Sequence, residues 1–421
     1  MTATFDPLEL TEPSAPTPSG PVAYLTGNYP MISHTFIMRE VHALRRLGIE
    51  VLTCTMRPSF RKDFTGVNEI VAVDETFCVS HAARKPLGLL AAHLAILKRT
   101  PGRWVSALAL AWKTRPPGAK ALLWQLFYFL ESAVLARHLR RAGVVHLHNH
   151  FANSSCSVAM LTSEISGIPF SFTLHGPAIF YEPMHWRLDE KIARARFVSC
   201  ISHFARSQAM YFSDPAHWDK LQIVHCGVTP AAYGRRARDS YGRHVLFVGR
   251  LDAIKGVPLL LAAFAAARKR FPDAQLSIAG DGPARAALEA QAASLGLGES
   301  VTFLGYRSQQ EVAALLEEAD MLVLPSFAEG LPVVLMEALA SRIPVIASAV
   351  AGVPELVEDG VSGFVIPAGH LGALADRLER LLADPALCRR MGEAGRAKVE
   401  AEFDISREAA QLARHFASAT G

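Results

Sequence analysis

A strand–helix–strand unit between residues 321 and 347 is the feature that most restricts the fold of this chain. Met321–Leu324 is a short apolar run that Pro325 ends, as expected for a buried parallel strand. Val333–Ser341 has helical periodicity, and Pro344–Ala347 has the pattern of the next buried strand. Parallel strands that are joined by a helix belong to α/β folds, so we expect a parallel sheet covered by helices.

The loop between the first strand and the helix of this unit is a candidate anion site. It places the backbone N–H groups of Gly330, Leu331 and Val333 at a helix N-terminus, where anions bind. Glu329 lies in the loop and Glu337 lies about one turn inside the helix. Carboxylates there can accept hydrogen bonds from hydroxyls while the N–H groups hold a phosphate, and a nucleotide sugar carries both groups. On charge alone, two acids favourably placed near a helix N-terminus are the simpler interpretation.

The alternation of strands and helices occurs twice along the chain. Val22–Thr26 ends in Gly27 and precedes a helix and another strand, which predicts a Rossmann-like sheet, although Gly27 equally fits a plain tight turn. The pattern restarts at Val245–Val248 after a segment rich in glycine and proline. We therefore expect two α/β domains, divided into a disordered tail 1–20, a first domain 21–226, a linker 227–243, a second domain 244–402 and a final segment 403–421.

Composition limits the classes of protein to which the chain can belong. Its 421 residues suffice for two domains, and a net charge of +4 is too small to indicate a nucleic-acid partner. Six cysteines are scattered without a Cys-x-x-Cys pair, so we expect reduced thiols in a cytoplasmic protein. The sequence predicts neither a secretory signal nor a transmembrane helix, because it lacks an early basic region followed by an apolar run and any uninterrupted apolar run of about 18 residues.

The segment Thr76–Leu130 has an unusual charge distribution. It carries eight basic residues and no acidic residue, and it contains three of the five tryptophans, Trp104, Trp112 and Trp124. An ordinary helical insertion with solvated basic positions explains this pattern. A surface for anionic lipid explains it too, because basic and aromatic residues together suit a membrane interface. We expect helices at Leu87–Leu97, Val105–Trp112 and Ala119–Arg141.

Histidines follow two of the predicted strands of the first domain. A strand predicted at Val144–His148 and the residues after it carry three alternating histidines, His146, His148 and His150. A metal site is conceivable there, but the neighbouring sequence offers no carboxylate or cysteine, so we expect no metal. His175 directly follows the predicted strand Phe170–Leu174, at the edge where open parallel sheets bind ligands. It is therefore the better functional candidate, and a loop histidine bonded to backbone is the alternative.

Five motifs in the second half resemble, in order, those of the retaining GT-B glycosyltransferases of glycosyltransferase family 4. They are Gly249-Arg250 with Lys255-Gly256, Gly280-Asp281-Gly282-Pro283, Leu304-Gly305-Tyr306, the glutamates of Glu-Gly-Leu-Pro-Val-Val-Leu-Met-Glu, and Gly352-Val353-Pro354-Glu355. The first half is similar to the exopolysaccharide subgroup, of the colanic-acid type, through Ser33-His34-Thr35-Phe36-Ile37, His148-x-His150-Phe151 and Thr173-Leu174-His175-Gly176. Many members have Glu where His34 stands.

This resemblance implies two Rossmann-like domains that face each other across a cleft, with the C-terminal helix crossing back to the first domain. It implies catalytic roles for His175, Arg250, Lys255 and Glu329. Arg250 and Lys255 would hold the donor's diphosphate, Glu337 the ribose, Glu329 the transferred sugar and Tyr306 the base. The implied donor-binding set is Gly27, Arg250, Lys255, Gly282, Tyr306, Glu329, Gly330, Leu331 and Glu337.

The resemblance also implies transfer of a sugar from a UDP- or GDP-sugar to a glycan or lipid-linked acceptor, with retention of configuration. Double displacement needs a carboxylate beneath the anomeric carbon, and the sequence shows no obvious one beside His175, so we favour front-side attack. The sequence has no Asp-x-Asp pair, which agrees with a metal-independent enzyme without a cofactor. We expect a cytoplasmic protein, peripheral on the inner face of the plasma membrane. A nucleotide-sugar epimerase and a non-catalytic nucleotide-sugar sensor are the alternatives.

Overall fold

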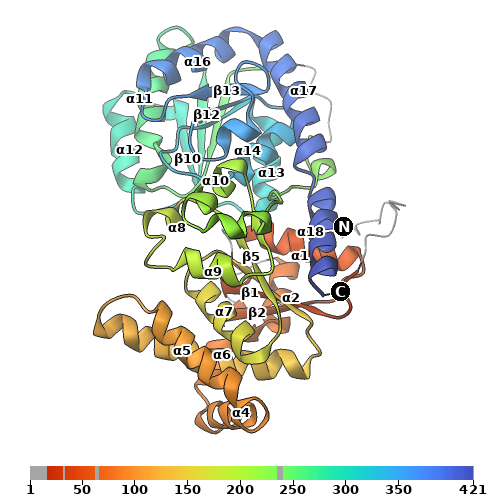
Figure 1. The fold of residues 1–421 in the computed structure, drawn as a ribbon. Coiled ribbons are helices and arrows are strands. Elements are labelled where there is room, and N and C mark those ends of the chain that lie inside the picture. Colours follow the sequence, from red (N-terminus) through yellow and green to blue (C-terminus); the bar gives the residue numbers. More distant parts are fainter. Residues whose placement is uncertain (1–16, 32–33, 62–65, 235–239, 421) are drawn as a thin grey trace.

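The computed structural model describes residues 17–31, 34–61, 66–234 and 240–420. Within these residues the chain forms two α/β domains, one above the other in Figure 1. The predicted fold class is therefore confirmed. The predicted tail and linker lie partly outside the described residues, at 1–16 and 235–239, as does Ser33.

The first domain is built on a parallel sheet whose described strands follow the order β3-β2-β1-β4-β5-β6-β7. The strand order reverses between β1 and β4, which is the arrangement of a doubly wound sheet with its ligand crevice at that point. The strands are β1 (Val22–Asn28), β2 (Val51–Arg57), β3 (Phe77–Cys78), β4 (His146–His150), β5 (Phe170–Leu174), β6 (Val198–Cys200) and β7 (Leu221–Ile223).

Helices connect these strands, and three of them form an extension at one end of the molecule. The extension consists of α4 (Pro86–Arg99), α5 (Pro101–Thr114) and α6 (Ala119–Arg141), at the bottom of Figure 1. The other helices of this domain are α1 (Thr35–Arg46), α2 (Val67–Glu75), α3 (Val79–Ala83), α7 (Ser154–Ser166), α8 (Ala178–Tyr181), α9 (Leu188–Arg194) and α10 (His203–Tyr211).

The second domain repeats the same plan, and its described strands follow the order β10-β9-β8-β11-β12-β13, all parallel. The strands are β8 (His244–Val248), β9 (Gln275–Ala279), β10 (Val301–Gly305), β11 (Met321–Leu324), β12 (Val345–Ser348) and β13 (Gly363–Ile366). The helices are α11 (Val257–Arg268), α12 (Arg285–Ser294), α13 (Gln309–Glu318), α14 (Val333–Ala340), α15 (Val353–Leu356), α16 (Leu371–Ala383) and α17 (Pro385–Glu402).

The strand–helix–strand unit predicted from residues 321–347 is present as β11, α14 and β12. All residues of β11 and β12 are buried, because helices cover both faces of a parallel sheet. Pro332 is the N-cap of α14, and the helix begins at Val333. The apolar runs therefore identified both strands correctly.

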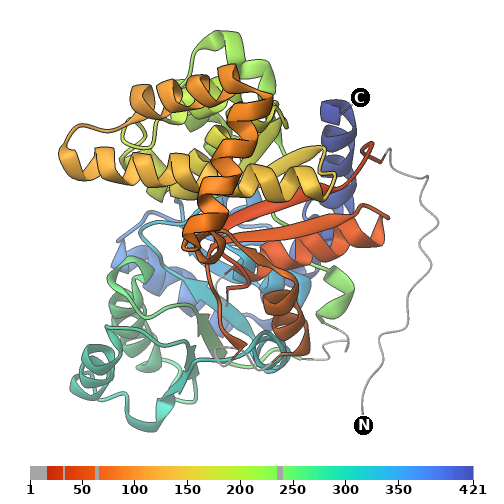
Figure 2. The ribbon, with the colours of Figure 1, turned by 90° about the horizontal axis from the view of Figure 1, so that it is seen from below.

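The last helix, α18 (Ile405–Thr420), packs on the first domain, beside α1 in Figures 1 and 2. Its apolar face, with Leu412 and Phe416, shares a core cluster with Val41 of α1 and Tyr24 of β1. Ser19 is also held at this helix, since its backbone N–H donates to Oγ1 of Thr420 at 3.4 Å. The helix thus crosses back as the resemblance implied, and residue 19 of the predicted disordered tail has a defined partner.

Two details of the first domain differ from the prediction. The strand predicted at Val144–His148 is β4 and runs from His146 to His150, so the third histidine belongs to the strand itself. Trp104, one of the three tryptophans considered for a lipid-facing surface, instead packs against Phe129 in the core and donates its indole N–H to Nδ1 of His93 at 2.9 Å. Periodicity could not distinguish its buried side from the exposed side of α5.

Candidate functional site

A cleft of about 690 Å³ lies where the two domains meet, and side chains from both of them line it. It contains eight of the predicted site residues: His175, Arg250, Lys255, Tyr306, Glu329, Gly330, Leu331 and Glu337. Gly27 and Gly282, which were predicted to bind the donor, are not among the residues that line it. The Cβ of any other residue at position 282 would lie 2.3 Å from the carbonyl oxygen of Leu251, so this glycine permits a close backbone approach.

Lys255 and Glu329 form an ion pair on the second-domain side of the cleft. Nζ of Lys255 lies 2.6 Å from Oε1 of Glu329, and the side chains are 22% and 10% exposed. Lys255 is placed by a tight turn that ends at Gly256, whose φ of 64° favours glycine. A cation and a carboxyl that neutralise each other can both turn to a ligand that carries phosphate and hydroxyl groups.

Arg250 and Tyr306 are the exposed members of the predicted set. The Arg250 side chain is 72% exposed, and its Nε lies 3.7 Å from Oδ2 of Asp252, which is too far for a hydrogen bond. Tyr306 is also exposed, directly after the end of β10. Both residues line the cleft, and their exposure allows them to adjust to a ligand.

Glu337 is held by two residues that the sequence did not identify. Its Oε1 accepts hydrogen bonds from Arg39 of α1 at 2.5 Å and from the hydroxyl of Tyr233 at 2.9 Å. The Arg39 contact is an ion pair between the two domains, with both side chains largely buried. Burial lowers the pKa of Arg39, but Glu337 and Tyr233 raise it more, so the guanidinium stays charged. No local pattern in the sequence relates residues 39 and 337.

The loop that carries Glu329 also touches the first domain. A Cβ on Gly330 would lie 2.1 Å from the carbonyl oxygen of His175, so only glycine permits this approach. Gly352 donates its N–H to the Gly330 carbonyl at 3.0 Å. Three residues further on, the carboxyl of Glu355 accepts hydrogen bonds from the backbone N–H groups of His203 (2.7 Å) and Phe204 (2.8 Å) at the start of α10. Two of the five motifs therefore join the domains beside the cleft.

His175 is buried at the first-domain side of the cleft. Burial, with the neighbouring His150 and His34, holds its pKa well below the usual range, so the ring is neutral. Its Nε2 lies 2.8 Å from Nδ1 of His150, and its Nδ1 lies 3.5 Å from Sγ of Cys226. A neutral ring with both nitrogens engaged acts through its position and its hydrogen bonds and not through charge.

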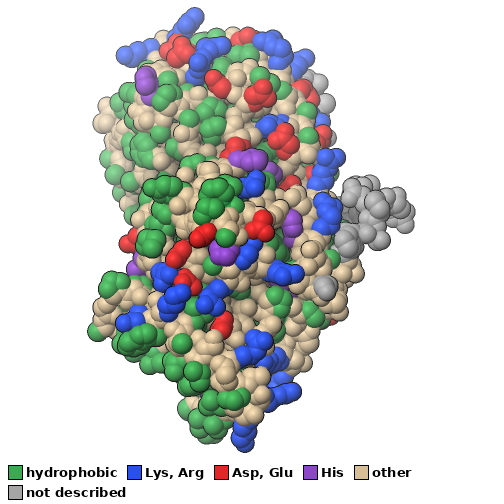
Figure 3. All heavy atoms as spheres, in the orientation of Figure 1, with side chains coloured by type: hydrophobic (Ala, Val, Ile, Leu, Met, Phe, Trp, Pro, Cys, Tyr) green, Lys and Arg blue, Asp and Glu red, His purple; other side chains and the backbone are tan. Residues whose placement is uncertain are grey.

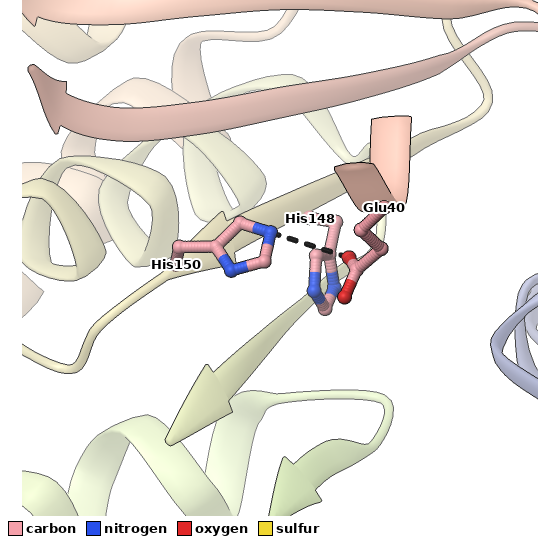
Figure 4. A group of neighbouring side chains, drawn as sticks. All are labelled: Glu40, His148 and His150. Carbon is pink, nitrogen blue, oxygen red and sulfur yellow. Dashed lines mark ion pairs between the residues drawn. The ribbon is translucent and has the colours of Figure 1, made fainter. Parts of the chain in front are cut away.

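The histidines do have a carboxyl neighbour, contrary to the prediction from the sequence. Glu40 of α1 lies beside His148 and His150 of β4 (Figure 4), and their possible ligand atoms lie within 4.8 Å of one another. Both ring nitrogens of His148 also bond hydroxyls, of Ser171 at 2.7 Å and Thr173 at 2.8 Å. The arrangement fits a hydrogen-bonded network better than a metal centre.

Comparisons with known proteins agree with this geometry. Residues 235–398 match the family "Glycosyl transferases group 1", and residues 33–232 match "Glycosyltransferase Family 4". The chain is 32% identical over 299 residues to alpha-D-kanosaminyltransferase of Streptomyces kanamyceticus, which covers 64% of this chain and 75% of that protein. It is 34% identical over 194 residues to the amylovoran biosynthesis glycosyltransferase AmsK of Erwinia amylovora, which covers 44% of this chain. The match spans about half of AmsK, 48%.

Solved structures share the fold across both domains. Anabaena HepE, whose structure contains UDP-glucose, superposes with a TM-score of 0.69 at 18% identity and covers 94% of this chain and 99% of that one. This likeness concerns the arrangement of the two domains. Together with the family matches to both halves and the similarity to the kanosaminyltransferase, it shows that this chain belongs to the GT-B glycosyltransferases of group 1, of the family 4 type.

Proposed function

We propose that this protein is a retaining hexosyltransferase that moves a sugar from a UDP- or GDP-sugar to a glycan or lipid-linked acceptor in the biosynthesis of exopolysaccharide or cell-surface polysaccharide. The observation that carries the proposal is the Lys255–Glu329 ion pair in the interdomain cleft, with Glu337 and His175 lining the same space. A nucleoside-diphosphate sugar offers a phosphate to the cation and hydroxyls to the carboxyls.

The proposed roles follow from the chemistry of the leaving group. Negative charge grows on the diphosphate as the glycosidic bond breaks, and preorganised cations stabilise it. Lys255 supplies a point charge, while Arg250 can form two parallel hydrogen bonds to phosphate oxygens. Once Lys255 turns to the phosphate, the carboxyl of Glu329 is free to accept hydrogen bonds from hydroxyls of the sugar. Glu337 binds the ribose, and Tyr306 contacts the base.

Retention by front-side attack is supported by where the carboxyls of the first domain lie. Among the described residues that line the cleft, that domain contributes one acid, Glu69. The pKa of Tyr306 is raised by burial and then by Glu69, so this acid lies on the side of the cleft that we assign to the base. Glu40 lies behind His150 in the core. We therefore infer that the departing phosphate accepts the acceptor's proton.

A role in polysaccharide assembly is supported by the similarity to AmsK and by the surface of the helical extension. Of the eight basic residues in Thr76–Leu130, only Lys113 has an ion pair within the described chain, with Glu190 at 2.5 Å. Hydrophobic and basic side chains occur together at this end of the molecule (Figure 3). The exposed apolar residues are Leu87, Leu90, Leu94, Val105, Leu108, Trp112, Leu122, Leu123, Trp124, Leu126 and Phe127.

We infer that this extension docks on anionic lipid at the inner face of the plasma membrane, where a lipid-linked acceptor is available. Apolar and aromatic side chains reach the headgroup region, and each Lys or Arg near the surface contributes about 1 kcal/mol. Among the described helices, α6 alone is long and apolar enough to cross a membrane, and 33% of its apolar window is buried within the protein. Its packing against α7 and α4 favours a surface contact.

The test of this function is a product analysis by NMR spectroscopy. The protein is incubated with UDP- and GDP-sugars and a lipid-linked acceptor in excess EDTA, and the anomeric configuration of the new linkage is compared with that of the donor. We expect the same configuration and full activity without divalent ions. An inverted product would overturn the front-side mechanism, and dependence on a divalent ion would overturn metal independence.

A further inference from the structure

A row of buried polar side chains leads from the core of the first domain to the cleft. It begins at Tyr24 of β1, whose hydroxyl donates to Oε1 of Glu40 at 2.7 Å. Nε2 of His150 lies 3.4 Å from the same oxygen, along the dashed line in Figure 4. Nδ1 of His150 lies 2.8 Å from Nε2 of His175, which lines the cleft. Four side chains from different parts of the domain thus contact one another, each with the next, in a single row.

The hydrogen positions along this row follow from its first member. Tyr24 is a donor, because burial and the neighbouring Glu40 keep its pKa well above the usual value, so Oε1 of Glu40 is an acceptor. Nε2 of His150 makes no hydrogen bond within the described residues and faces this acceptor, so it carries the hydrogen. His175, whose Nδ1 faces the protonated thiol of Cys226, carries its hydrogen on Nε2 and donates it to Nδ1 of His150.

The last member of the row is fixed in the same way. With its hydrogen on Nε2, His175 presents an Nδ1 without hydrogen to the thiol of Cys226. Burial raises the pKa of this thiol, so it stays protonated and can donate to Nδ1. Phe36 and Phe151 pack on the ring, with centroids 4.7 and 4.8 Å from that of His175. The carbonyl of the same residue lies against Gly330 of the donor loop. The same residue thus has its ring fixed within the first domain and its backbone against the donor loop.

We propose that Glu40 and His150 are positioning residues of the transferase, which set the tautomer and the ring orientation of His175 at the sugar end of the cleft. The inference rests on the proposed role of His175 in the function above. In this role, neither side chain contacts the donor. The role accounts for a carboxyl and a histidine that are buried behind the cleft.

The kinetic test uses Glu40→Met, which removes the acceptor oxygen, and Glu40→Gln, whose amide oxygen can still accept from Tyr24 and His150. We expect the Met variant to lose about tenfold or more in kcat with donor KM nearly unchanged, and the Gln variant to recover part of the loss. Glu408→Met is the comparison variant, because Glu408 is equally buried and its carboxyl accepts a hydrogen bond from the backbone N–H of His225 and not from a side chain of the row.

A spectroscopic measurement on the unaltered protein tests the proposed tautomers even if a variant does not fold. Long-range ¹H–¹⁵N correlation spectra distinguish a ring nitrogen that carries hydrogen from one that does not. We expect hydrogen on Nε2 of both His150 and His175, and a changed pattern at His175 in Glu40→Met. The opposite tautomers, or equal kcat losses in Glu40→Met and Glu408→Met, would overturn the proposal. Absence of turnover in the unaltered protein would refute the proposed function instead, while the spectra would still test the row.

Discussion

Replacement of Lys255 by alanine tests the proposed diphosphate site most sharply. The ion pair that Lys255 forms with Glu329, at 2.6 Å, is the contact that the donor's phosphate is expected to replace. The substitution Lys255→Ala removes one preorganised cation without altering the backbone, because the side chain extends from a turn whose geometry Gly256 provides.

Activity and stability respond to this substitution for different reasons. Loss of one preorganised electrostatic donor costs about 2–4 kcal/mol of transition-state stabilisation. That corresponds to a fall in kcat/KM of about 30-fold to about 900-fold. The Lys255 and Glu329 side chains are only 22% and 10% exposed, so removal of Lys255 also leaves a largely buried carboxyl without its cation and lowers the free energy of unfolding. The loss of activity should exceed the loss of folded protein.

The assay measures initial rates of nucleoside-diphosphate release at subsaturating donor, together with urea unfolding. Lys398→Ala is the matched control, because Lys398 pairs with Glu402 at 3.0 Å in α17 with a side chain 20% exposed and does not line the cleft. We expect the control to retain its rate. Equal rates for Lys255→Ala and Lys398→Ala, or a loss that parallels lost stability, would refute the assignment.

Three further predictions concern the ribose site, the lipid surface and the pH dependence of stability. Glu337→Gln should raise donor KM about tenfold or more with kcat largely kept, because ribose contacts exist before and during the reaction, whereas Glu329→Gln should lower kcat. The protein should sediment with vesicles of anionic lipid at low salt, and replacement of Trp112 and Trp124 by alanine should weaken that binding. Burial, with Arg196, lowers the pKa of His146 to about 3. The contribution of this residue to the free energy of unfolding is therefore fully present above pH 6.5, the pKa in the unfolded chain, and is lost as the pH falls. At pH 5 the loss is roughly 2 kcal/mol, which urea unfolding measures.

Each of these predictions has an outcome that contradicts it. If Glu337→Gln lowered kcat and Glu329→Gln raised donor KM instead, the roles assigned to these two glutamates would be wrong. Equal recovery on neutral and anionic vesicles, or no binding at low salt, would leave α4–α6 as an ordinary helical extension. For the pH prediction, His146→Gln should lose about 2 kcal/mol less than the unaltered protein between pH 7.5 and pH 5. An unchanged difference would show that other groups cause the acid sensitivity.

Local patterns in the sequence predicted those parts of the fold that local physics determines. Apolar runs located strands such as β11 and β12, because a strand buried on both faces must be apolar throughout. His175 was predicted to face the cleft because parallel strands bring their carboxyl ends to one edge, whereas Lys255 was identified through the family resemblance; both line the cleft. Ala119–Arg141 was also predicted with the bounds that α6 has.

Contacts that depend on tertiary packing could not be predicted from the sequence. Arg39 meets Glu337 because α1 faces α14 across the domain boundary, and no periodicity relates positions 298 residues apart. Glu40 meets His150 because α1 packs beside β4 within the first domain, so the sequence did not show that the histidines have a carboxyl neighbour. The buried side of α5, which takes up Trp104, depends on the helices around it.

Release of nucleoside diphosphate from a panel of UDP- and GDP-sugars is the decisive measurement of sugar transfer. We expect at least one donor to raise the melting temperature of the protein and to release its nucleoside diphosphate when a glycan or lipid-linked acceptor is present, in excess EDTA. Conversion of a nucleotide sugar to its epimer without release would identify an epimerase. Donor binding with no release in the presence of any acceptor would identify a sensor, and either result would contradict the proposed sugar transfer.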